Sequence, residues 1–149
     1  MVKLLSLRAV APEWAKFLVR SLLKKGASVC VVDINEKTAK ATADEIIAAG
    51  GKAKAYAIDI TNEAAVEALF DDAVATFGRL DVYFTIAGIS PVGTAVTTSY
   101  ADYKKVVALD MDSVFLGSKY CIPHMIKNRW WRNTLIWLEL MAFAQHRIS

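Results

Sequence analysis

"SVCVVDINE", residues 28–36, is the stretch that decides the fold. Between Val29 and Ile34, five residues are apolar and only Asp33 is charged. A short β-branched apolar run is typical of a strand covered on both faces, as the strands of parallel sheets are. We therefore predict a buried strand that ends at Asp33.

Strand-like and helix-like segments alternate along most of the chain. The helix after Asp33, for example, is expected to begin at a cap, Asn35, and to end at Gly50–Gly51. Strand–helix units of this length require right-handed parallel crossovers. The predicted fold class is therefore α/β, a three-layer Rossmann-type doubly wound parallel sheet truncated to about four or five strands. The expected strands are residues 3–7, 27–33, 53–59 and 79–88, and the expected helices are residues 12–26, 35–51, 61–78 and 99–127.

Residues 129–149 depart from this alternation, and we interpret them as a divergent apolar tail after a partial Rossmann domain over residues 1–128. Within the tail, "TLIWLEL", residues 134–140, is either a fifth strand or part of an amphipathic helix, and both interpretations stay open. A membrane-surface role for the Arg/Trp cluster is a third interpretation. The helical interpretation places four residues on one face, namely Trp131, Leu135, Leu138 and Met141.

Length and composition narrow the class of protein. The chain has 149 residues, 55% hydrophobic and 22% charged, which suits one globular domain. No apolar run reaches the roughly 18–20 residues that cross a bilayer, and Arg8 interrupts the first apolar segment early. We therefore expect a cytoplasmic protein with no transmembrane segment. The spacing of Cys30, Cys121, His124 and His146 indicates no disulfide framework or metal site, and no basic-aromatic pattern points to nucleic acid.

Three segments within residues 26–128 resemble the short-chain dehydrogenase/reductase family in their order and spacing. They are "GASVCVVDINE", "DITNEAAVEALFDDAVATFGRLDVYFTIAG" and "VFLGSKYCIPHMIKN". The resemblance implies a dinucleotide-binding sheet and hydride transfer between NAD(P)(H) and an alcohol or carbonyl carbon.

The resemblance also assigns roles at two strand ends. Asp33, with Ile34 beside it, matches the acid that accepts hydrogen bonds from both adenosine ribose hydroxyls. A carboxylate there repels a 2′-phosphate, so NAD is expected in preference to NADP. Asp59, closing the third strand, matches the acid that contacts the adenine amino group, with the Ile60 backbone beside it. The alternative interpretations are a strand-end turn for Asp33 and a helix cap for Asp59.

Ala87 and Gly88 match the second half of the family's Asn-Asn-Ala-Gly turn, where small residues let the cofactor approach the backbone. Thr85 and Ile86 stand where the two asparagines are expected. The side-chain bonds that tie this turn to neighbouring strands are therefore in question.

The family's glycine-rich turn should occupy residues 8–15, which read "RAVAPEWA". Ala9, Glu13 and Ala15 stand at the three glycine positions. Glycine there lets backbone amides touch the pyrophosphate, and Glu13 adds a negative charge where the helix dipole attracts phosphate. Binding of NAD is therefore expected to be weak or undetectable.

The family's catalytic residues are a Ser, a Tyr, a Lys four residues later, and an Asn in the preceding long helix. Asp110 stands at the Asn position, Leu138 stands near the expected serine, and the Tyr and Lys would lie beyond Ser149. Tyr100 and Lys104 have the required spacing, but their register places them at the start of the long helix, away from a substrate pocket.

Two interpretations of function follow. The first is a fragment or degenerate member of the NAD(P)-dependent short-chain oxidoreductases, inactive as this chain, whose ends reflect truncation or a shifted reading frame. The second is a non-catalytic interaction protein that forms a homo-oligomer through the helix from about Ser99 to Lys127. On that helix, Val114, Phe115 and Leu116 are expected to lack cover.

Overall fold

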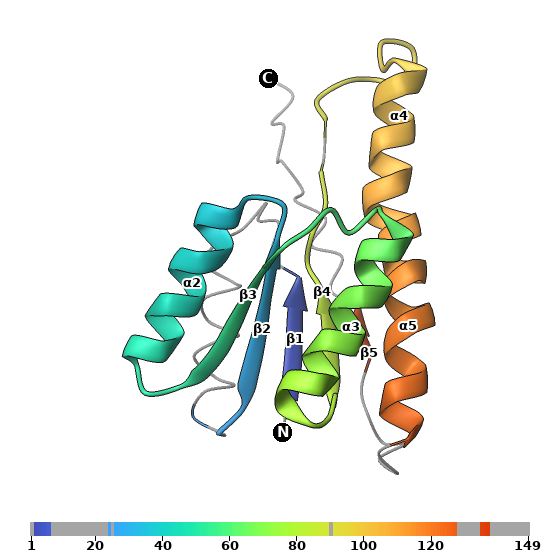
Figure 1. Cartoon of the computed structure of the whole chain (residues 1–149). Helices are drawn as coiled ribbons and strands as arrows, with labels where there is room; N and C mark the ends of the chain where they lie inside the picture. Colours follow the sequence, from blue (N-terminus) through green and yellow to red (C-terminus); the bar gives the residue numbers. More distant parts are fainter. Residues whose placement is uncertain (1, 7–23, 25, 90, 128–134, 138–149) are drawn as a thin grey trace.

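The computed structural model describes residues 2–6, 24, 26–89, 91–127 and 135–137, to which all structural statements refer. The strands are β1 (Val2–Ser6), β2 (Ser28–Asp33), β3 (Lys52–Ala57), β4 (Val82–Thr85) and β5 (Leu135–Trp137). The helical segments are α2 (Glu36–Ala48), α3 (Glu63–Phe77), α4 (Tyr100–Val107), the π-turn η1 (Ala108–Asp112) and α5 (Ser113–Lys127). The strands form a five-stranded sheet in the order β3-β2-β1-β4-β5 (Figure 1).

Every neighbouring pair of strands in this sheet is parallel. Asp33 of β2 is in register with Ala57 of β3, and Thr85 of β4 is in register with Ser6 of β1. The carboxyl ends of β2, β3 and β4 therefore meet at one edge of the sheet. The chain order reverses at β1, which lies between β2 and β4, and such reversal points are where open α/β sheets bind ligands.

Alternate residues of β2 divide the core into two parts. Cys30 and Val32 pack with residues of α3 and α5, whereas Val29 and Val31 pack with residues of α2. This follows from the period of two along a strand. The sheet therefore lies between two helical layers, with α3 and α5 on one side and α2 on the other (Figure 1). The predicted three-layer α/β fold is confirmed.

Short polar residues and glycines set the helix ends, as the sequence predicts for Asn35, Gly50 and Gly78. The Asn35 side chain caps α2 by accepting from the N–H groups of Lys37 and Thr38, and the Asn62 side chain caps α3. Gly50 and Gly78, each at φ 81°, take the left-handed conformation that ends a helix.

Three sequence expectations are refined by the structure. Strand β5 at Leu135–Trp137 confirms the strand interpretation of the tail segment. The long helix from 99 to 127 is interrupted by η1 and is not uniformly α-helical. Phe115 is exposed as expected and Val114 is half-buried, but the expectation that Leu116 lacks cover is wrong. Leu116 is buried against the core, because consecutive residues of an α-helix point about 100° apart. The helix expected at 12–26 lies outside the described residues except at its end.

No helix in the described part of the chain is long and apolar enough to cross a membrane. Helix α4 contributes no buried side chain to the fold and extends past the carboxyl edge of the sheet (Figure 1).

Candidate functional site

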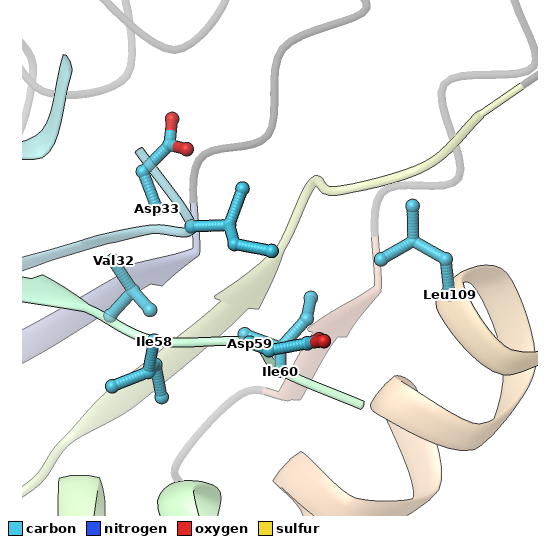
Figure 2. A pocket seen from close by; sticks show the side chains of 7 residues that line it. Val32, Asp33, Ile58, Asp59, Ile60 and Leu109 are labelled. Carbon is cyan, nitrogen blue, oxygen red and sulfur yellow. The ribbon is translucent and has the colours of Figure 1, made fainter. Parts of the chain in front are cut away.

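Asp33 is the last residue of β2 and lies at the carboxyl edge of the sheet. Its side chain is 8% exposed, and its Oδ1 accepts a hydrogen bond of 2.8 Å from the backbone N–H of Asn35. Asp33 thus supports the turn that starts α2, as the alternative interpretation expects. Its Oδ2 has no hydrogen-bond partner among the described residues, and the carboxylate points away from Ile58 and Asp59 in Figure 2.

Asp59 does not close β3, since that strand ends two residues earlier at Ala57. Its Oδ1 accepts hydrogen bonds from the backbone N–H of Thr61 at 2.9 Å and from the Thr61 hydroxyl at 2.8 Å. The cap of α3 is Asn62, so the helix-cap interpretation of Asp59 is also wrong. Asp59 instead stabilises the turn between β3 and α3, and its side chain is exposed.

These strand ends surround a shallow pocket (Figure 2). The cavity volume is only about 10 Å³, roughly the room for one water molecule, so this edge holds no enclosed cavity for a larger molecule. The Asp59 carboxylate points toward the side of the pocket that Leu109 forms (Figure 2). The lining residues are Val32, Asp33, Ile34, Ile58, Asp59, Ile60 and Leu109.

The turn after β4 contacts η1. Asp110 accepts a hydrogen bond of 3.2 Å at Oδ1 from the backbone N–H of Ile89. A Cβ placed on Gly88 would lie 3.2 Å from the same oxygen, which is tighter than most contacts of real side chains. Thr85, Ile86, Ala87 and Gly88 follow one another at this strand end, and the first three are buried. The small residues therefore let the turn approach the Asp110 carboxylate closely.

Burial raises the pKa of the Asp110 carboxyl above its ordinary value, and the Ile89 N–H partly opposes this rise. No charged side chain among the described residues contributes to the shift. The π-turn η1 places the half-buried Asp110 beside the turn that follows β4. Such π-turns inside helices are frequent at functional sites.

The Tyr100–Lys104 pair does not contribute to this site. Tyr100 is 75% exposed and stacks on Tyr103, with ring centroids 6.0 Å apart. Both members of the pair lie on α4, which buries no side chain. His124 Nε2 lies 3.2 Å from Asp71 Oδ1, an α5–α3 contact on the helical layer. Among the described residues, no cluster of His, Cys, Asp and Glu side chains could hold a metal ion.

Several predicted positions lie outside the described residues. They are the segment 8–15 at the expected glycine turn, Leu138 near the expected serine, and His146. The structure brings Asp33, Ile34, Asp59 and Ile60 together at the pocket. It places Ala87, Gly88 and Asp110 together at the neighbouring turn.

Two features at this edge were not anticipated from the sequence. Leu109 lines the pocket, and Ser113 bonds to the backbone of η1. The only signal for Ser113 in the sequence is a hydroxyl residue three positions after Asp110, directly before the apolar run from Val114 to Leu116.

A parallel sheet with this strand order, with an acid at the carboxyl end of β2, is typical of a Rossmann-type domain. The family model described as "Enoyl-(Acyl carrier protein) reductase" matches residues 14–143. The chain belongs to the short-chain dehydrogenase/reductase family.

Individual relatives agree with this membership. The chain is 31% identical over 112 residues to the meso-2,3-butanediol dehydrogenase of Serratia marcescens, covering 74% of this chain and 43% of the relative. It is 38% identical over 104 residues to an uncharacterized oxidoreductase of Thermotoga maritima, covering 70% of this chain and 41% of the relative. The chain therefore spans less than half the length of these relatives.

A solved structure of a putative short-chain dehydrogenase/reductase from Burkholderia xenovorans superimposes with a TM-score of 0.78. The match covers 86% of this chain and 52% of that one at 29% identity. The relatives are thus a dehydrogenase and an oxidoreductase by name, and the chain shares the fold of the solved structure over the part that it spans.

Proposed function

We propose that residues 1–128 form the adenosine-binding half of an NAD site in a short-chain oxidoreductase, with NAD preferred to NADP. The observation that carries this is Asp33, a buried acid at the end of β2 whose Oδ2 has no partner among the described residues. That oxygen can accept a hydrogen bond from a ribose hydroxyl, and its charge repels a 2′-phosphate.

The residues around Asp33 fit the adenosine end of such a cofactor. Ile34 is half exposed beside the acid, and Ile60 supplies apolar surface on the β3 side of the pocket. When bound, NAD would accept hydride from an alcohol carbon at its nicotinamide ring. At the β4 end, the small side chain of Ala87 would let the cofactor approach the backbone, whereas the space beside Gly88 is taken by the Asp110 carboxylate.

We also propose that this chain by itself transfers no hydride. Ala9, Glu13 and Ala15 occupy the positions where the family uses bare backbone against the diphosphate. Asp110 replaces the amide that the family uses in its long helix, and an ionised carboxylate cannot donate a hydrogen bond.

Ligand-observed NMR with NADH and NADPH tests both proposals. We expect weak saturation transfer to the adenine protons of NADH, less transfer to those of NADPH, and no oxidation of simple secondary alcohols. Equal transfer to both nucleotides would contradict the NAD preference. Turnover that disappears in Tyr100→Phe would contradict the second proposal.

A second candidate function is self-association through the exposed face of α5. Four large apolar side chains, one on η1 and three on α5, are at least 43% exposed and form the α5 stripe: Met111, Phe115, Ile122 and Ile126. An exposed apolar stripe of this kind marks an interaction surface. It supports the homo-oligomer interpretation of the long helix.

The spacing of the α5 stripe suits a two-fold pair. Its gaps are four, seven and four residues, so the pattern is the same in both directions. An antiparallel pair of α5 helices would place Met111 opposite Ile126 and Phe115 opposite Ile122 of a second copy. Near the axis, Lys119 is already paired with Glu63 at 2.6 Å, which reduces repulsion between the two lysines. Sedimentation velocity over a range of concentrations tests this association.

A further inference from the structure

Ser113 makes an unusual pair of hydrogen bonds at the start of α5. In a regular α-helix its backbone N–H would bond to the carbonyl of Leu109, four residues earlier. Here that N–H bonds to the carbonyl of Ala108, five residues earlier. The Leu109 carbonyl is thus released, and the Ser113 hydroxyl donates a hydrogen bond to it.

The Ser113 hydroxyl is in a buried environment, where both polar groups need partners. Ser113 is 1% exposed and Leu109 is 4% exposed. A buried carbonyl without a hydrogen-bond partner is destabilising, because it has lost its bond to water. By donating to the Leu109 carbonyl, the Ser113 hydroxyl removes the destabilisation that an unpaired carbonyl in the π-turn would cause.

The π-turn directs two successive residues to different parts of the candidate cofactor site. Leu109 lines the pocket beside Asp33 and Asp59. Asp110 holds the Ile89 N–H at the turn after β4. The π-turn contains one residue more than a turn of α-helix, and one residue corresponds to a rotation of roughly 100° about the helix axis. If η1 became regular α-helix, α5 would be rotated by about this angle relative to α4, and Leu109 and Asp110 could not both keep their positions.

We propose that Ser113 is a positioning residue of the candidate cofactor site: its hydroxyl holds the π-turn η1, and η1 holds Asp110 against Ile89 and Leu109 in the pocket. The role of the site in binding NAD rests on the proposed function, but the positioning itself does not. Ser113 does not itself line the pocket; its hydroxyl bonds to the backbone carbonyl of Leu109, which does, so Ser113 acts through η1.

The surroundings of Asp110 make the Ile89 amide a usable reporter. The segment Ile86 to Ile89 has no titratable side chain, and Asp112 in η1 is exposed. Ionisation of Asp110 should therefore dominate the pH response of the Ile89 N–H. Asp112→Asn is a matched control, because it removes a carboxylate from the same turn.

Solution NMR of the nucleotide-free chain tests the proposal with two readouts. The first is the scalar coupling across the hydrogen bond from Ser113 N, either to the Ala108 or to the Leu109 carbonyl carbon. The second is the change of the Ile89 amide shift with pH. In the unmodified chain and in Asp112→Asn we expect coupling to Ala108 and a clear Ile89 titration. Asp110→Asn should keep the coupling and lose the titration.

Ser113→Ala should move the coupling to Leu109 and reduce the amplitude of the Ile89 titration at least about threefold, whereas Ser113→Thr should preserve both readouts. Ser113→Ala with both readouts unchanged would overturn the proposal. If Ser113→Ala does not fold, Ser113→Cys replaces it, because a thiol is a weak hydrogen-bond donor. The same changes of the coupling and of the Ile89 titration are then expected. A chain that shows these responses and binds no NADH would contradict the proposed function alone.

Discussion

Gly117 of α5 lies directly against the ring of Tyr83 in β4, so that a Cβ on Gly117 would stand 2.5 Å from the ring atoms Cε1 and Cζ. Tyr83 is itself fixed, since it is buried and packs edge-to-face on Phe70 at 5.4 Å between centroids. The ring cannot move away without opening the core. The missing side chain at residue 117 therefore sets how closely α5 approaches the sheet.

Gly117→Ala should destabilise the fold although alanine is the better helix former. The helix gains about 1 kcal/mol from alanine, but overpacking in a core costs typically about 1–3 kcal/mol, and here the contact is with a rigid ring. We expect a net loss of about 1 kcal/mol or more in the free energy of unfolding, measured with urea. Ser118→Ala, its half-buried neighbour, should stay within about 0.5 kcal/mol of the unmodified chain. A more stable Gly117→Ala would contradict the close packing.

Asp33→Asn should weaken the discrimination between the two nucleotides. Removing the charge relieves the repulsion of a 2′-phosphate, so the ratio of NADPH to NADH affinity should rise about tenfold, or about 1.4 kcal/mol. Competition in ligand-observed NMR measures this ratio. Glu36→Gln removes an exposed acid three residues away and should leave it unchanged; an equal effect of both variants would indicate long-range charge and not a ribose contact.

Asp110→Asn should stabilise the chain at neutral pH. Burial raises the pKa of Asp110, so the folded state binds this proton more tightly than the unfolded state does. The cost of ionisation is therefore fully present above the folded pKa and absent below the unfolded value of about 3.9. The amide keeps an acceptor for the Ile89 N–H without that cost. The stability difference from the unmodified chain should shrink as pH falls toward about 4, in urea unfolding series at each pH.

For this pH series, Asp112→Asn serves as the control, because Asp112 is exposed. Its stability difference from the unmodified chain should vary less with pH than that of Asp110→Asn. A difference for Asp110→Asn that grows on acidification would show that the carboxylate is stabilised, not penalised, by its surroundings.

The two free cysteines should be unreactive in the folded chain. Burial raises the pKa of Cys30 to about 12 and that of Cys121 to about 12, and both are fully buried. Because the thiolate is the nucleophile, both should react with a disulfide reagent at pH 8 only as fast as the chain opens. Reaction should become fast in denaturing urea. Rapid native labelling of either thiol would mean that the core around it is open.

Phe115→Glu should abolish association through the α5 stripe. A charge in the middle of an apolar interface cannot be desolvated cheaply, so we expect a shift to monomer in sedimentation velocity. Val92→Glu, at an 89% exposed position in the loop before α4, is the control for an added charge. If both variants sediment like the unmodified chain at every concentration, α5 does not mediate association.

Much of the fold could be predicted because local signals agree with it. The run from Val29 to Val32 is apolar on both sides, and the sheet covers it on both faces. Asn35 and Gly78 cap helices for reasons that lie in the neighbouring backbone alone. Such features need no knowledge of distant residues.

The candidate site was less predictable because its contacts are long-range. Asp110 and Ile89 are 21 positions apart, and only the π-turn brings the carboxylate to the amide. The helical period of the sequence does not reveal the additional residue in η1. The sequence predicts Asp59 at the end of its strand because "AIDIT" continues the apolar run, but the pairing of β3 with β2 stops at Ala57.

The position of β1 has a consequence for the order of folding. It pairs with β2 nearby in the chain and also with β4, from which it is separated by residues 7–81. Closing the long loop between β1 and β4 costs more chain entropy than forming the β2–β3 pair, so we expect it to be slower. During synthesis, β1 would therefore remain an open edge until Val82–Thr85 leave the ribosome, and this interval is when the nascent chain most needs protection from aggregation.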